Sequence, residues 1–194
     1  MPHEYSAQNH DWDLTLRAAH DLLMIGQFIG RIPTKGTLSK EFSCLSGSML
    51  LSFCAVESFS ASVAFSMPSD DRFRGFDFEK YRQASRFWDK IEILCSAIQI
   101  KIDKSQGLFQ KISEMQIWRN LVTHASPYDI PPTVVTNTVK APGKLHAHFE
   151  NKEYARIIDV KNAKIFYSTA FDYITLIKES SGIDPRASAS YKVG

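Results

Sequence analysis

The feature that most constrains this chain is a long, almost uncharged segment at residues 39–66. Apolar side chains recur in it at mostly three- and four-residue spacing, at Phe42, Leu45, Met49, Phe53, Val56 and Val63. This period predicts a helix that begins at Ser39, because a half-buried strand would show a period of two. The part from 44 to 67 is long enough to span a membrane, but it is rich in serine and carries Glu57 near its middle. We therefore predict a buried helix of a bundle rather than a membrane span.

The same period predicts four further helices, over residues 11–30, 78–102, 103–124 and 160–179. In the segment 78–102 the spacing alternates between three and four residues over three heptads, at Tyr81, Ala84, Trp88, Ile91, Cys95, Ile98 and Ile102. Such a seam packs either against an antiparallel neighbour in the bundle or against a helix of another subunit. The predicted fold class is all-α, a helical bundle of four to five helices.

Residues 133–159 differ in character from the rest of the chain. The strand-like stretches "TVVTNTV" and "KLHAHFE" flank the turn signal "KAPG", which predicts a small β-hairpin insertion near residues 133–159. Residues 181–194 show no apolar period and are predicted to be a disordered tail. We expect one domain over residues 1–180, with an N-terminal helix (1–38), core helices (39–124), the loop and hairpin (125–159) and a last helix (160–180).

Composition narrows the class of protein. Cys44, Cys54 and Cys95 lie in apolar helical runs without a CxxC pair, which is typical of buried free thiols in a reducing compartment. The N-terminus is polar and acidic and does not resemble a signal peptide, so we expect a cytoplasmic protein. Residues 1–71 carry a net charge of −4 and residues 72–194 a net charge of +6. The excess is compatible with an anionic partner and equally with a solvated surface.

Several common enzyme classes are excluded by their missing motifs. The sequence has no phosphate-cradling glycine loop, no HExxH, no GxSxG and no zinc-finger spacing. His146 and His148 would share one face of a strand, but no third ligand lies near them, so neither a metal site nor a cofactor is predicted. Lys140, Lys144 and Arg156 lie in or beside the predicted hairpin. They are candidates for RNA-phosphate contacts, and the alternative is a sheet edge protected by its charges.

The stretch "MQIWRNLVTHAS" at 115–126 places polar side chains where a packing helix would carry apolar ones. At about 100° per residue, Arg119 falls within the apolar stripe of the helix, whereas Asn120 and His124 share another face. A guanidinium within such a stripe is costly unless it is paired. Arg119 therefore faces a wet interface or cleft, or it pairs with a buried carboxylate. Glu57, the lone acid in the middle of the predicted helix 39–66, is the candidate for that carboxylate.

Arginine, asparagine and histidine together suit the cleavage of an RNA phosphodiester without a metal. Histidine moves protons near neutral pH, arginine matches phosphate oxygens, and asparagine orients either group. On an ideal helix, however, Arg119 and His124 diverge by about 140°. Two copies that meet across a two-fold axis would bring these groups into one cleft.

The string "RNLVTH" resembles the R-x4-H motif of HEPN domains (higher eukaryotes and prokaryotes nucleotide-binding), in which a polar residue, often Asn, follows the Arg. The motif lies here late in a predicted bundle, before a proline-containing loop and one more helix. The resemblance implies a single HEPN-like helical domain that forms a homodimer with a composite ribonuclease site. The catalytic residues would be Arg119, Asn120 and His124, with Glu57 in a supporting role. It further implies a toxin or defence effector, with RNA as substrate and a cognate antitoxin or defence-system protein as partner.

The sequence departs from one extended form of this motif, R-x4-H-x-Y, in which a partner enzyme modifies the Tyr. Ser126 takes the Tyr place, and Tyr128 follows two residues later. Other family members have lost catalysis and serve as binding or dimerisation modules. Three hypotheses therefore follow from the sequence: an endoribonuclease, a non-catalytic helical module, and an RNA- or nucleotide-binding regulator that uses the basic hairpin.

Overall fold

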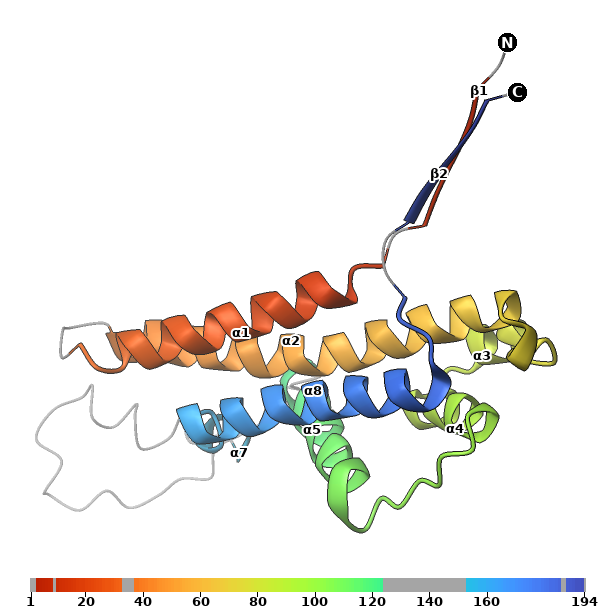
Figure 1. Ribbon diagram of the computed structural model, residues 1–194. Helices are drawn as coiled ribbons and strands as arrows, with labels where there is room; N and C mark the ends of the chain where they lie inside the picture. Colours follow the sequence, from red (N-terminus) through yellow and green to blue (C-terminus); the bar gives the residue numbers. More distant parts are fainter. Residues whose placement is uncertain (1–2, 9, 33–36, 124–152, 186–187, 194) are drawn as a thin grey trace, which may run out of the picture.

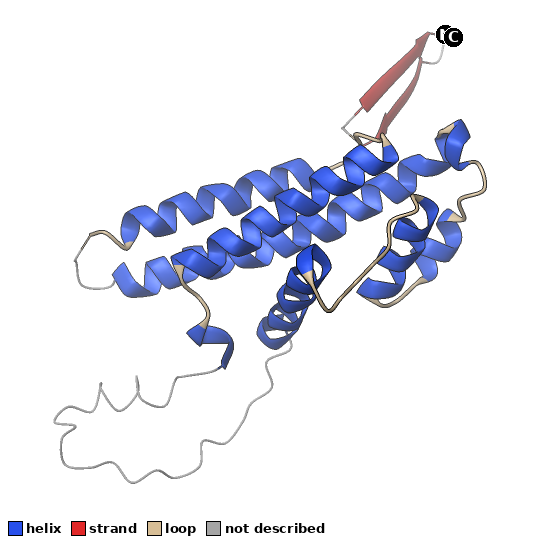
Figure 2. Ribbon diagram, turned by 60° about the horizontal axis from the view of Figure 1, so that its bottom comes forward, coloured by secondary structure: helices blue, strands red, loops and turns tan. Residues whose placement is uncertain are grey.

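The computed structural model describes residues 3–8, 10–32, 37–123, 153–185 and 188–193. Helices α1 (Trp12–Ile29), α2 (Thr37–Ser66) and α8 (Val160–Ser181) run lengthwise side by side, and α5 (Gly107–Thr123) crosses them (Figures 1 and 2). The short helices α3 (Phe78–Gln83) and α4 (Phe87–Ala97) lie near the C-terminal end of α2, and α7 (Glu153–Arg156) precedes α8. The predicted all-α class is confirmed.

Helix α2 is the centre of the bundle and contacts α1, α3, α4, α5 and α8. Every member of its predicted stripe is buried except Phe42, which is 41% exposed. Its length and mean hydropathy would allow it to cross a membrane, but 61% of the apolar window is buried inside the fold. The many serines of α2 are compatible with burial because they bond to helix carbonyls, as Ser52 Oγ does to Ser48 O at 2.8 Å.

Helices α1 and α2 approach each other closely. Ser48 Oγ donates to the Ala19 carbonyl oxygen across the interface at 2.7 Å. A Cβ atom added at Gly26 would lie 2.7 Å from Leu45 Cδ2, so only glycine fits this contact without displacing Leu45. The α1–α2 pair is closely packed, and α8 packs against both of its helices.

The single helix predicted over 78–102 is wrong. The helix ends after Gln83, the backbone of Ala84 and Arg86 is extended, and α4 begins at Phe87. Helix α4 ends in turn at Ala97, and Gln99 adopts a left-handed φ of 59°. Most of the seam's large side chains remain in or against the core, so the spacing identified buried residues correctly but not the turn between them.

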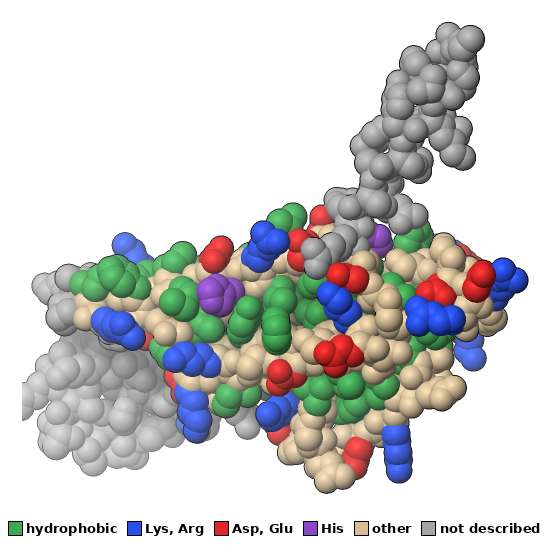
Figure 3. Space-filling model, viewed as in Figure 1, with side chains coloured by type: hydrophobic (Ala, Val, Ile, Leu, Met, Phe, Trp, Pro, Cys, Tyr) green, Lys and Arg blue, Asp and Glu red, His purple; other side chains and the backbone are tan. Residues whose placement is uncertain are grey.

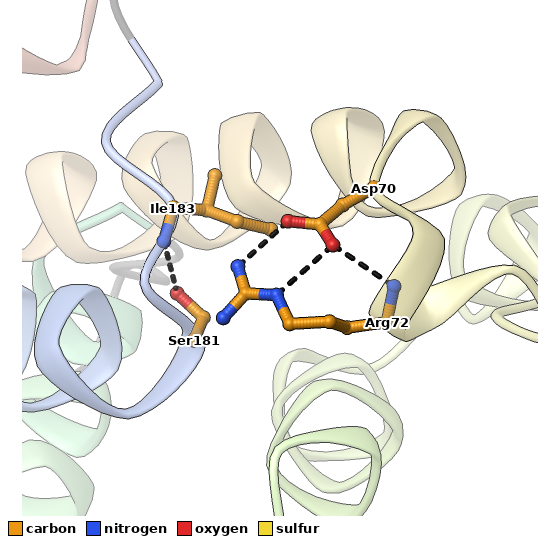
Figure 4. Close-up of polar contacts among 4 residues, drawn as sticks. All are labelled: Asp70, Arg72, Ser181 and Ile183. Atoms are coloured by element: carbon orange, nitrogen blue, oxygen red, sulfur yellow. Dashed lines mark hydrogen bonds and ion pairs between the residues drawn. The ribbon is translucent and has the colours of Figure 1, made fainter.

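The end of α8 is fixed to the turn that follows α2. Gly182 caps α8 with a φ of 66°, and a Cβ atom there would lie 2.9 Å from Arg72 Nη1. Arg72 also donates from Nε and Nη2 to the two carboxylate oxygens of Asp70, at 3.0 and 2.6 Å (Figure 4). The Ile183 amide donates to Ser181 Oγ at 3.1 Å in the same turn.

The chain ends pair with each other, which corrects the prediction of a disordered tail over 181–194. Strand β1 (His3–Gln8) and strand β2 (Ser188–Val193) form an antiparallel ribbon that extends away from the helices (Figure 1). Trp12 Nε1 donates to the Pro185 carbonyl oxygen, and Ile183 is buried. The tail needed no apolar period because its strand pairs with a segment at the other end of the sequence.

The predicted hairpin lies largely outside the described residues, which resume at 153. From that point the chain forms α7, so the described end of the region 133–159 is helical and not part of a hairpin. Glu153, Ala155 and Arg156 have high helix propensity, which explains the difference.

Candidate functional site

Helix α5 places the candidate arginine at the edge of the core. Its buried side chains are Phe109, Ile112, Met115 and Trp118. Trp118 is 2% exposed and packs edge-on against Phe166 with ring centroids 5.3 Å apart, so it anchors the C-terminal half of α5 on α8. The next residue, Arg119, points from the same helix toward α2, and its side chain is 29% exposed.

Arg119 makes the ion pair that the sequence predicts. Its Nη2 atom lies 3.3 Å from both carboxylate oxygens of Glu57 on α2. The guanidinium carbon also lies 5.5 Å from the centroid of the Phe53 ring, where a cation is attracted by the face of the aromatic ring. The Glu57 side chain is 34% exposed, so the pair is largely but not fully buried.

Asn120 contributes in a way that helix geometry alone did not indicate. Its Oδ1 accepts a hydrogen bond from Arg119 Nη1 at 3.0 Å, although the two residues leave the helix in different directions. The long arginine side chain bridges the gap. Asn120 and Glu57 therefore hold the guanidinium from two sides. A guanidinium has five N–H donors, so several remain for a ligand.

Burial sets the protonation behaviour around this ion pair. Desolvation raises the pKa of Glu57, and the attraction and hydrogen bonding of Arg119, with the charge of Lys90, lower it against that effect. Desolvation and then the Glu57 charge raise the pKa of the nearby Cys54 thiol, so this cysteine stays protonated near neutral pH. The cysteine is thus a packing group here and not an activated nucleophile.

The remaining predicted site residues are placed only in part. His124, Lys140 and Lys144 lie outside the described residues, as do His146 and His148. Arg156 is exposed at the end of α7, which contacts α5. Within the described segments, no three or more His, Cys, Asp or Glu side chains are grouped as a metal would need.

A second group of polar residues lies beside Glu57, and no sequence motif predicts it. Tyr81 on α3, Ser85 in the break before α4, and Lys90 on α4 line one pocket with Glu57. The heptad pattern assigns Tyr81 to a helix seam and gives no role to Lys90. The turn at Ala84–Arg86 brings these residues together, and no local sequence motif predicts that turn.

Charge is not concentrated on the face of the molecule drawn in Figure 3. Lys and Arg side chains are interspersed there with Asp and Glu, and hydrophobic side chains gather between them. The positive excess of the C-terminal two-thirds therefore does not form one basic surface on that side.

Comparison with known proteins found no similar family. No protein-family model matches the chain, and neither a curated protein nor a solved structure matches it.

Proposed function

We propose that the protein is a metal-independent endoribonuclease of the HEPN type, acting on single-stranded RNA as a cytoplasmic homodimer. The observation that supports this most is the pairing of Arg119 with Asn120 and Glu57 near the end of α5. A partly exposed guanidinium is held there with unused donors. His124 follows the last residue of that helix.

In the proposed reaction, the ribose 2′-oxygen attacks the adjacent phosphorus and the bond from phosphorus to the 5′-oxygen breaks. His124 of one protomer takes the 2′-hydroxyl proton, and the corresponding His of its partner delivers a proton to the departing 5′-oxygen. The products are a 2′,3′-cyclic phosphate and a 5′-hydroxyl. Arg119 stabilises the charge that develops on the phosphoryl oxygens, and Glu57 and Asn120 are its positioning residues.

A two-fold interface on α5 would supply the second set of groups. Ile117 and Leu121 lie one turn apart on α5 and are 58% and 44% exposed, beside the arginine and asparagine of the motif. Exposed apolar side chains next to a polar site suit a contact between two copies of the chain. Lys140, Lys144 and Arg156 are proposed to contact RNA phosphates. An antitoxin or defence-system protein is the proposed regulatory partner.

The test is cleavage of single-stranded RNA in excess EDTA, with the ends of the products identified. We expect cyclic phosphate ends and their loss in His124→Ala. His20→Ala is the matched control, since His20 is a half-exposed histidine on α1. Equal cleavage by wild type and His124→Ala, or no cleavage by either, would refute the proposal.

The second candidate is a non-catalytic helical interaction module, which the ion pair itself favours. Both oxygens of Glu57 accept from Arg119. Such a pair can stabilise the packing of α2 against α5 without any catalytic role. This candidate predicts a stable oligomer that does not cleave RNA. Salt-dependent RNA binding that survives His124→Ala would instead indicate a binding regulator.

A further inference from the structure

The break between α3 and α4 opens a small pocket directly beside the ion pair. Its volume is about 100 Å³, and its walls come from α2, α3 and α4. Pockets for drug-sized ligands measure ~300 Å³ or more, so a whole nucleotide does not fit, whereas one small heterocycle does. Glu57 belongs both to this pocket and to the pair with Arg119.

One polar group of the pocket makes no hydrogen bond within the described segments. The Tyr81 residue is 4% exposed, yet its hydroxyl makes no hydrogen bond with any residue that the structure describes. Its ring is fixed by Phe76 and Phe78, with centroids 6.4 and 6.2 Å away. A hydroxyl on the lining of a pocket with no hydrogen bond to the described residues is available to a ligand, as donor or as acceptor.

Charged groups of both signs line the pocket together with Tyr81. Lys90 Nζ lies 5.7 Å from the centroid of the Tyr81 ring, and within the described part of the chain Lys90 forms no ion pair. The Glu57 carboxylate has four lone-pair positions, and only one nitrogen of Arg119 occupies them. The pocket thus offers acceptors at Glu57, donors at Lys90, and a hydroxyl that can do either.

This pattern selects among the nucleobases. Cytosine presents an exocyclic amine that donates to a carboxylate, and beside it a ring nitrogen and a carbonyl oxygen that accept from Lys90 and Tyr81. Uracil would turn a carbonyl oxygen toward the carboxylate, and adenine has a second ring. Phe87 adds an aromatic wall, on which an unstacked base of single-stranded RNA would pack.

We propose that this pocket binds an unpaired cytosine of the RNA strand whose phosphate contacts Arg119. The inference rests on the proposed function in that RNA is the ligand. Glu57 then has two contacts: it positions Arg119 and it accepts from the cytosine amine. Glu57 thereby links recognition of the base to Arg119, the residue that contacts the phosphate.

Binding is measured separately from cleavage, with fluorescein-labelled oligonucleotides that are 2′-O-methylated and cannot be cut. A uridine strand with one central cytosine is compared with the all-uridine strand and with one carrying a central adenine. We expect the cytosine to tighten binding about tenfold, as one well-paired base contact does. Tyr81→Phe keeps the ring and should remove about fivefold of that gain. Ser85→Ala, in the exposed break, should reduce it by a smaller factor.

Tyr167→Phe is the control, because Tyr167 packs against His20 on the α1 side of α8 and does not line the pocket. It should keep the full cytosine preference. Equal affinity for the three strands, tighter binding of adenine, no binding of any, or a preference unchanged by Tyr81→Phe would overturn the proposal. Cleavage without a cytosine preference in binding refutes this inference and leaves the ribonuclease standing. A cytosine preference that depends on Tyr81, without cleavage by wild type, refutes the ribonuclease and supports the cytosine pocket.

Discussion

Substitution of Glu57 by alanine leaves the Arg119 guanidinium on the inner side of α5 without its carboxylate. The two charges are 3.3 Å apart, and their side chains are 34% and 29% exposed. Removal of Glu57 therefore leaves a largely desolvated cation without its carboxylate partner. Asn120 and the Phe53 ring remain in contact with Arg119 and offset part of the loss.

The expected loss of unfolding free energy lies between the values known for exposed and for fully buried ion pairs. Exposed ion pairs contribute about 0.2–1 kcal/mol, whereas breaking a fully buried pair costs about 3–5 kcal/mol. The 3.3 Å contacts are longer than the best charge-assisted hydrogen bonds. We expect Glu57→Ala to lower the free energy of unfolding by about 2 kcal/mol, nearer the lower limit because the pair keeps some solvent contact.

A double-mutant cycle separates the pair from the surroundings of each residue. Urea unfolding of wild type, Glu57→Ala, Arg119→Ala and the double variant should give a coupling energy of about 1 kcal/mol. Arg82 and Glu79 form the matched control, with a 2.8 Å contact and side chains 66% and 60% exposed. Their coupling should stay below about 0.5 kcal/mol. Equal coupling in the two cycles would show that burial does not strengthen the Glu57 pair and would refute this reasoning.

Three further predictions concern groups away from the site. Thr169 Oγ1 is buried without a hydrogen-bond partner among the described residues, so Thr169→Val should leave the free energy of unfolding unchanged or raise it by up to about 1 kcal/mol; a clear loss in urea unfolding would contradict this. Burial raises the pKa of the Cys95 thiol to about 12, so a thiol reagent at neutral pH should modify it only after unfolding, and rapid labelling of the folded protein would contradict the packing. Hydrogen bonds from Arg72 lower the pKa of Asp70 from 3.8 to about 2, so this carboxylate stabilises the fold above pH 3.8 and loses that effect as pH falls toward 2. Thermal unfolding should show a deficit of Asp70→Asn against wild type at neutral pH that shrinks through that window, and a deficit independent of pH would exclude the ionised pair.

Much of the fold could be predicted from local pattern. The apolar periods located α1, α2, α5 and α8 to within a few residues at most boundaries, because a helix buries one face and its spacing records that face directly. The pairing of Glu57 with Arg119 was also predictable, since a cation on an apolar stripe needs a carboxylate and α2 offers only one near its middle. Phe42 fits the stripe by spacing but is 41% exposed, and nothing in the spacing along α2 predicts this.

The turn between α3 and α4 depended on tertiary packing. Residues 84–86 contain neither glycine nor proline, and the apolar spacing continues through them. The chain turns there because Tyr81 and Ile91 reach the core from two short helices. The antiparallel pairing of β1 with β2 likewise joins the two ends of the chain, and no period within either segment records its partner.

The sequence by itself determined the helices, the buried stripe of α2 and the presence of a charged pair within it, because these depend on side chains a few residues apart. Only the tertiary structure decided what stands around that pair. It set the direction of the Arg119 side chain, whose guanidinium contacts Asn120, and it placed Tyr81 and Lys90 in one pocket with Glu57 across a turn that the spacing does not record. Local periodicity specifies which face of a helix is buried, whereas the neighbours of a buried carboxylate are set by where separate helices meet.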